Sequence, residues 1–153
     1  MSLEKESLKF IRLVIVIATT GLVTLSASAE VRNVNQPNKL QLVMQGLLND
    51  SLLLNQGIFY QDFAKIEQSA KDIANHPTPG IGTMKKVKSH LGTEMVNFKG
   101  FDIMVHDTAV KINEAAVKKD IEAVKSAYHE LLNGCLSCHI QYKERISKIL
   151  SNN

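Results

Sequence analysis

The 153-residue sequence contains no tryptophan, and aromatic residues make up only 5% of it. Side chains of this composition would fill a protein core thinly, and a large apolar cofactor would help to fill it. The chain also lacks any run of basic residues and any alternation of basic with aromatic residues, and its formal net charge is only +3. We therefore predict that nucleic acid is not a partner.

Patterns typical of enzymes are missing as well. The sequence has no Ser/His/Asp combination, no paired carboxylates and no phosphate-binding loop, so we do not expect an enzyme. It also has no Gly/Ser linker, internal repeat or low-complexity tract, and its length predicts one domain, residues 30–153. The acidic residues of the helices are scattered as on solvated faces: Asp50, Asp62, Glu67, Asp102 and Glu114.

The N-terminus has the pattern of a secretory signal peptide. An uncharged apolar stretch, residues 13–25, is followed by Ala-Ser-Ala at 27–29, which is the small-x-small pattern of a cleavage site. We predict cleavage before Glu30 and a periplasmic protein without a membrane anchor. An uncleaved anchor is the alternative, but a spanning helix needs about 20 apolar residues. No cysteine lies directly after the apolar stretch, which excludes a lipid anchor at this site. The basic residues before the stretch are Lys5, Lys9 and Arg12.

Apolar residues recur at helical spacing along the first half of the mature chain. A first helix is predicted to begin near Pro37 and a second to cover residues 58–75, before the Pro- and Gly-rich segment 76–82 breaks the chain. The predicted inner face of the first helix is Leu40, Met44, Leu47, Ser51 and Leu54, and that of the second is Phe59, Phe63, Ile66, Ala70 and Ile73.

Two further helical regions follow. Residues 83–118 contain one long helix or a short helix followed by a longer one, because Gly92 and Gly100 make the start uncertain; a last helix covers residues 120–150. Four amphipathic segments with mostly short connections predict an all-α, up-and-down antiparallel four-helix bundle. Its predicted inner faces are Phe98, Phe101, Val105, Ala109, Ile112 and Ala116, and then Ile121, Val124, Tyr128, Leu131, Cys135, Cys138, Tyr142 and Ile149.

The only two cysteines lie in the predicted last helix, in the sequence Cys135-Leu-Ser-Cys138-His139. This is C-x-x-C-H, the attachment motif of haem c. Each thiol adds to one haem vinyl group, and the three-residue separation places both sulfurs on one side of a helical turn. The imidazole of His139 can then reach the iron as an axial ligand. We predict one covalently bound haem.

A C-x-x-C pair has two other common uses. A redox disulfide usually opens a helix after a strand, whereas this pair lies well inside a predicted helix. A structural zinc site needs about four ligands, and the chain has no second Cys/His pair with short spacing. Gly134, directly before Cys135, is either a position where the macrocycle approaches the backbone or a tolerated helix defect.

A C-x-x-C-H motif in the last helix of a four-helix chain resembles cytochrome c′ and its low-spin, methionine-ligated relatives. The resemblance covers most of residues 37–150 and is strongest around residues 133–143. That family often has an aromatic and then a basic residue three and four places after the ligand histidine, where this chain has Tyr142 and Lys143. The resemblance implies that both lie next to the haem. The family's basic residue is usually arginine, so Lys143 departs from the pattern.

The resemblance also implies a sixth iron ligand. In the family the first helix supplies the residue facing the open side of the haem, and aligning the first helices puts Met44 there. A His/Met-ligated haem favours electron transfer, so the resemblance implies a one-electron carrier that serves redox partner proteins. From spacing alone, a methionine on an inner stripe is more often a core residue. Competing ligands are Met84, Met95, Met104, His76, His90, His106 and His129.

Two other functions stay open at this point. One is a five-coordinate cytochrome c′ that binds NO or CO; the other is a periplasmic bundle without haem that binds a metal or another protein. Members of the family often dimerise through their first two helices. Leu48, Leu52 and Leu53 widen the apolar arc of the first helix, which allows a homodimer or a wider monomer core.

Overall fold

The computed structural model describes residues 38–151, and it is helical with no strand in this range. The all-α prediction is therefore confirmed. The predicted signal peptide, residues 1–29, and its cleavage site lie outside the described residues. None of the helices within residues 38–151 is long and apolar enough to cross a membrane.

The first described helix, α2, covers Lys39–Tyr60 and begins with a capping box. The side chain of Asn38 accepts a hydrogen bond from the backbone N–H of Gln41 at 3.0 Å, and the Gln41 side chain accepts one from the backbone N–H of Asn38 at 2.9 Å. This reciprocal pair satisfies N–H groups that have no partner inside the helix. The helix therefore begins two residues after Pro37, where it was predicted to start.

The predicted boundary between the first two helices was wrong. Helix α2 continues to Tyr60 and ends at Gln61, whose φ of 52° is left-handed, and α3 covers Phe63–Ala74. Asp62 caps α3 by accepting a hydrogen bond from the backbone N–H of Lys65 at 3.1 Å. Phe59 thus belongs to the end of α2 and is 82% exposed, not on an inner face. The later residues of the predicted stripe, from Ile66 to Ile73, are buried as expected.

The third region contains a short helix followed by a longer one, as one of the two alternatives predicted. Helix α4 covers Ile81–Leu91, a 3₁₀ turn covers Gly92–Glu94, and α5 covers Met95–Val117. Gly92 has a φ of 54°, a conformation that favours glycine, and it ends α4. Gly100, by contrast, lies inside α5 without interrupting it.

The last predicted helix is one helical run with a change of pitch. Helix α6 covers Ile121–Cys138, a π-helical turn covers His139–Lys143, and α7 covers Glu144–Ser151. Asp120 caps α6 by accepting a hydrogen bond from the backbone N–H of Ala123 at 3.0 Å. Single π turns inside α-helices are rare and occur frequently at functional sites. Helical periodicity does not indicate such a turn, and it was not predicted.

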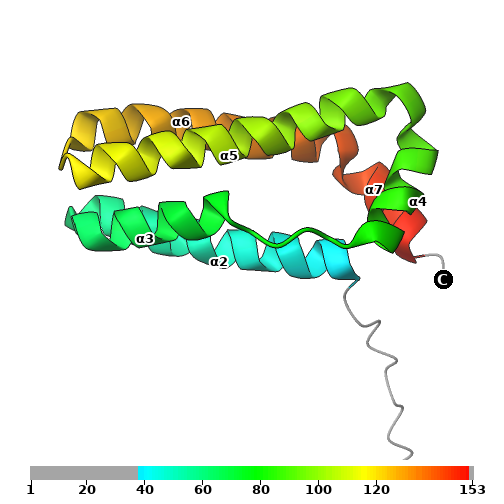
Figure 1. Ribbon diagram of the computed structural model, residues 1–153, viewed down its shortest axis with the longest axis horizontal. Helices are drawn as coiled ribbons and strands as arrows, with labels where there is room; N and C mark the ends of the chain where they lie inside the picture. Colours follow the sequence, from blue (N-terminus) through cyan, green and yellow to red (C-terminus); the bar gives the residue numbers. More distant parts are fainter. Residues whose placement is uncertain (1–37, 152–153) are drawn as a thin grey trace, which may run out of the picture. The chain divides into compact units, whose positions relative to one another are not determined.

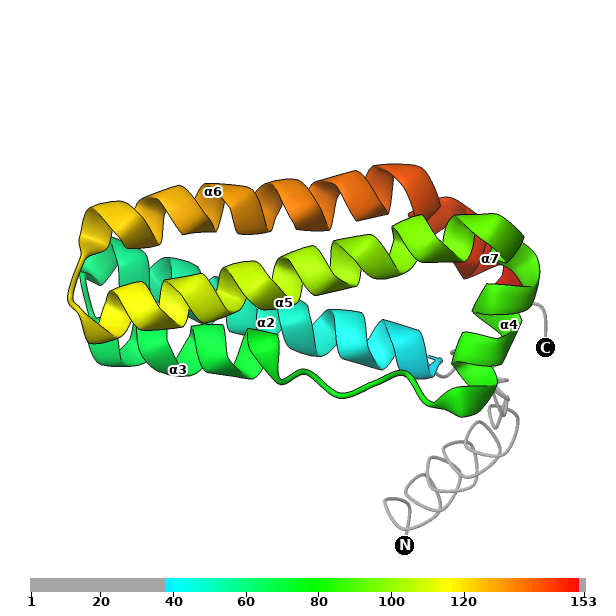
Figure 2. The same ribbon diagram turned by 45° about the horizontal axis from the view of Figure 1, so that its top comes forward.

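The four longer helices pack along one another (Figures 1 and 2). Helix α5 packs against both α3 and α6, and α2 packs against α3. Helices α4 and α7 contact each other at the end of the domain remote from the α2–α3 and α5–α6 turns, as both views show.

The buried residues form two clusters. The main cluster is built from α2, α3, α5 and α6, and the end cluster from α4, α5 and the last helical run. Cys135 packs against the main cluster and Cys138 against the end cluster, so the cysteine pair lies where the two meet. Buried members of the main cluster include Leu54, Ile66, Ile112, Val124 and Leu131; the end cluster contains Val87, Leu91, Met95, Tyr142, Ile146 and Leu150.

Candidate functional site

Both cysteines are partly buried free thiols within the helical run of α6. Burial raises the pKa of Cys135. Burial, with the nearby charges of Cys135 and Asp102, raises the pKa of Cys138 to about 11. The two thiols are therefore protonated at neutral pH.

This arrangement differs from that of a redox-active cysteine pair. Reactive C-x-x-C pairs lie near a helix N-terminus or a cation, which lowers the pKa of the attacking thiol. Here the shift is in the opposite direction, and Cys138 is the last residue of α6. Residues 38–151 also contain no group of three or more His, Cys, Asp or Glu side chains able to hold a metal ion.

His139 follows Cys138 directly and is the first residue of the π-helical turn. The residue is exposed, so the described part of the chain leaves it accessible. Partial desolvation and the charge of Lys143 lower the pKa of His139 below its usual value. The neutral imidazole that a metal ligand requires is thus favoured at neutral pH.

Gly134 is buried where α6 approaches α5. A Cβ atom at this position would lie 3.2 Å from Val105 Cγ2 and 3.3 Å from Met104 Sδ. Helix α5 therefore approaches the backbone at Gly134, which explains a glycine at this position, and the predicted approach of a macrocycle stays a prediction. Val105 and Met104 lie 29 and 30 residues before Gly134, so this contact could not be predicted from the sequence.

Tyr142 and Lys143 lie very differently. Tyr142 is 1% exposed and belongs to the end cluster together with Cys138, whereas Lys143 is exposed. The aromatic rings of Phe98 and Phe101 pack edge-on against Tyr142, with centroid separations of 5.5 and 6.2 Å. The Tyr142 hydroxyl is buried without a hydrogen-bond partner among the described residues.

Arg145 is a residue of the site that sequence reasoning missed. Its guanidinium lies 5.8 Å from the centre of the Tyr142 ring and donates two hydrogen bonds to Glu94, at 2.9 and 2.7 Å. This bidentate pair connects the last helical run to the 3₁₀ turn before α5. An arginine can donate two hydrogen bonds to one carboxylate in a single plane, and a lysine cannot. In this chain Arg145, and not Lys143, makes such a contact, and its partner is Glu94.

The described methionines fall into two groups. Met95 is buried in the end cluster and Met84 is packed against it, so both serve as core residues. Met44 is 38% exposed and Met104 is 46% exposed, and neither belongs to a core cluster. Met44 lies on α2 between Leu40, which packs in the cluster of Cys138, and Leu47, which packs in the cluster of Cys135. It therefore lies at the level of the cysteine pair.

The histidines outside the motif are placed as follows. His76 has a side chain only 13% exposed, and its Nε2 lies 3.3 Å from Asp102 Oδ1. Its Nδ1 lies 3.2 Å from the carbonyl oxygen of Pro77, so acceptor oxygens face both nitrogens. The hydrogen bond to Asp102 raises the pKa of His76, which favours an imidazolium and not a metal ligand. His90, His106 and His129 are exposed.

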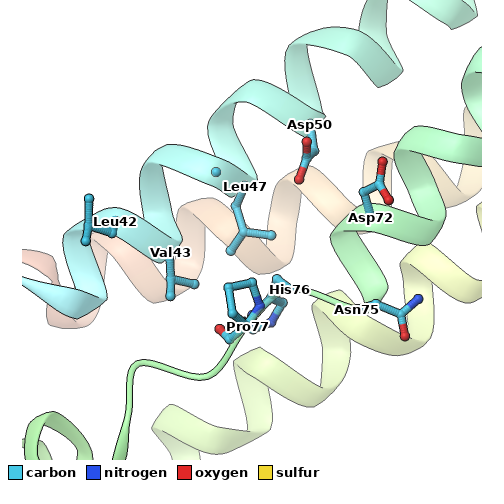
Figure 3. Close-up of a pocket in the computed structure, with 9 residues that line it drawn as sticks. Leu42, Val43, Leu47, Asp50, Asp72, Asn75, His76 and Pro77 are labelled. Atoms are coloured by element: carbon cyan, nitrogen blue, oxygen red, sulfur yellow. Dashed lines mark hydrogen bonds between the residues drawn. The ribbon is translucent and has the colours of Figure 1, made fainter.

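A pocket of about 280 Å³ lies between α2 and the segment that follows α3. Figure 3 shows Val43 and Leu47 of α2 facing His76 and Pro77 across it. A second pocket, of about 270 Å³, lies near the N-terminal ends of α2 and α4. Neither pocket is lined by Cys135, Cys138 or His139.

No protein-family model, curated protein or solved structure matches this chain. The assignment of a function must therefore rest on the residues of this chain alone. Two unpaired, protonated thiols and an exposed neutral imidazole follow one another within a single turn, and an unpartnered hydroxyl lies in the cluster of the second thiol. This donor set fits a covalently attached haem.

Proposed function

We propose that this chain is an exported monohaem c-type cytochrome that carries single electrons in the periplasm. Cys135 and Cys138 would hold haem c through two thioether bonds, and His139 would ligate its iron. The single observation that carries the proposal is the placement of these three side chains on one helical turn, with both thiols unpaired where the two buried clusters meet. The N-terminal residues 1–29 direct export.

The proposal includes an arrangement for the four longer helices. Helices α2, α3, α5 and α6 make an up-and-down antiparallel four-helix bundle, whose last helix carries the attachment motif and whose first helix carries Met44. Met44 would supply the other iron ligand. Met44 was predicted on the inner face of its helix, but Val43 is buried there instead and Met44 is 38% exposed, so its thioether is not packed in the core and stays available as a ligand.

When bound, haem supplies a one-electron iron couple, and methionine as the sixth ligand raises its potential. The chain's own residues hold and orient this group: Cys135 and Cys138 tether it, and His139 presents a neutral nitrogen. The protein binds no substrate in this role. It exchanges electrons with redox partner proteins.

The proposal predicts that the mature chain, exported in a host with a haem c maturation system, carries one haem that denaturation does not remove. Thioether bonds survive boiling in detergent, whereas a ligated but unbonded haem dissociates. Haem staining on a denaturing gel and the intact mass of the protein measure this directly. A colourless product with the mass of bare polypeptide would refute the proposal.

Met44→Leu is expected to convert the haem from low-spin to high-spin and to abolish the weak absorption band near 695 nm that is typical of Fe(III)–Met ligation. The matched control is Met104→Leu, the other exposed methionine near the motif, which should leave the spectrum unchanged. If both variants keep the parent spectrum and the reduced parent binds CO, the five-coordinate, NO- or CO-binding alternative replaces the electron carrier.

The outer surface of α2 supports a homodimer through the first two helices. Leu48, Leu52 and Leu53 are exposed, so they do not widen the monomer core. Between Lys39 and Tyr60, Asp50 is the only charged residue. An apolar surface with so little charge is typical of interfaces between subunits.

A further inference from the structure

The outer side of helix α5 carries a row of exposed apolar side chains. All of them are β-branched, each is at least 37% exposed, and each lies seven residues from the next. Seven residues are nearly two full turns of an α-helix, so the row runs almost straight along the helix. We call this row the α5 stripe. It consists of Val96, Ile103, Val110 and Val117.

The described part of the chain does not cover the α5 stripe. The helix packs against α3 and α6 through its other side, where Val105, Ala109 and Ile112 are buried. Helix α3 packs against both α2 and α5, so the stripe is a different surface from the apolar outer side of α2. Single exposed apolar residues are ordinary, whereas a continuous exposed row indicates a contact surface. Apolar residues repeated every seven positions are also the pattern through which two helices pack side by side.

A glycine beside the stripe points to the same conclusion. Gly100 lies inside α5, and a Cβ atom at this position would meet nothing within 4 Å. Glycine inside a helix is destabilising relative to alanine, and no turn or close contact within residues 38–151 accounts for this one. A second helix lying along the stripe would come close to this position, where the absence of a side chain leaves room for it.

The two edges of the α5 stripe carry opposite charges. Lys99 and His106 each follow a stripe residue by three positions and form a basic edge. Asp107 and Glu114 each follow a stripe residue by four positions and form an acidic edge on the other side. All four residues are exposed. His106 and Asp107 are paired within the chain at 3.0 Å, whereas Lys99 and Glu114 form no ion pair within residues 38–151.

These edges are complementary in one orientation of two copies. When two identical helices pack in parallel about a two-fold axis, the basic edge of each lies against the acidic edge of the other on both sides of the contact. In an antiparallel pair each edge would meet itself, so like charges would lie together. The parallel pair also places every stripe residue beside the same residue of the other copy. β-branched residues at such positions of a seven-residue repeat favour two-stranded packing.

We propose that the α5 stripe binds the α5 stripe of a second copy of this chain, with the two helices parallel, and that this contact forms a homodimer. The inference does not depend on haem attachment, and it concerns a surface other than that of the first two helices. A chain that used both surfaces would form assemblies larger than a dimer, because the two contacts lie on different helices of the bundle.

The first test isolates the α5 stripe in the background Leu48→Lys/Leu52→Lys, which places charge on the outer side of α2. Sedimentation equilibrium of the mature chain, with or without haem, should give the mass of a dimer in this background. Adding Ile103→Lys/Val110→Lys places like charges at the centre of the contact and should weaken dimerisation about a hundredfold or more. Circular dichroism checks that the helices remain formed. A background protein that is monomeric at every concentration up to about 1 mM would overturn the inference.

The second test changes the charges of the edges in the same background. Lys99→Glu/His106→Glu gives a chain with two acidic edges. Asp107→Lys/Glu114→Lys gives a chain with two basic edges. Each variant sets like charges together in the parallel pair, so its own dimer should weaken about tenfold or more.

An equimolar mixture of these two variants should form a heterodimer at least as tight as the dimer of the background protein, because opposite charges again meet along both edges. Since the charges that compensate each other are on separate chains, this recovery cannot come from folding within one chain. Variants that dimerise as well as the background protein, or a mixture that stays monomeric, would overturn the inference.

Discussion

Replacing Cys135 and Cys138 together with serine is expected to remove all covalently bound haem and leave the helices formed. The serine hydroxyl does not add to a vinyl group, so neither thioether can form. Both side chains are only partly buried, and each thiol is already a neutral group, so the exchange is a modest change for the fold. Haem staining and circular dichroism of the same preparation measure the two outcomes.

The single variants sharpen this test. Cys135→Ser and Cys138→Ser should each keep one thioether and therefore a stainable, detergent-resistant haem in reduced yield. Haem that remains covalently bound to the double variant would contradict the assignment of both residues. A double variant that also loses its helical signal would show that the thiols have a structural role as well.

Leu54→Ala is expected to lower the free energy of unfolding by about 2–5 kcal/mol, the usual range when a large buried side chain is truncated. Leu54 is 0% exposed and lies in the main cluster, packed among residues of three other helices. The cost includes the lost burial and the cavity that the rigid surroundings cannot close. Urea denaturation of parent and variant in the same haem-free background measures it.

Leu52→Ala is the control for this substitution, because the residue is in the same helix but 60% exposed. Its expected effect is within about 0.5 kcal/mol. If instead Leu52→Ala destabilises the protein only at high protein concentration, the exposed leucines lie in a subunit interface. Equal losses for the two variants at every concentration would contradict the placement of α2.

Much of the fold could be predicted because helical periodicity is a local signal. The residues predicted on the inner faces of α3, α5 and α6 are buried or partly buried in the structure, with Ile66, Ile112 and Val124 fully buried. The turn after α2 was misplaced by a few residues. Its decisive features are a left-handed Gln61 and the cap made by Asp62, and both residue types occur commonly elsewhere.

Only the part of the candidate site that is formed by neighbouring residues in the sequence could be predicted. The motif from Cys135 to His139 is contiguous, so its chemistry can be read directly. The pairing of Arg145 with Glu94 joins residues 51 positions apart, and the neighbours of Gly134 come from another helix. Such contacts depend on how helices pack, which periodicity does not specify. The unpartnered hydroxyl of Tyr142 is likewise a property of the packed core.

The division of the core into two clusters has a consequence for cooperativity. Helices α4 and α7 are held chiefly by the end cluster, and the remaining helices by the main one. Such units can open separately, each with its own free energy, and amide hydrogen exchange resolves them. A rigid macrocycle bonded to one sulfur in each cluster would link the two clusters covalently. The two clusters would then unfold together and not separately once the cofactor is attached.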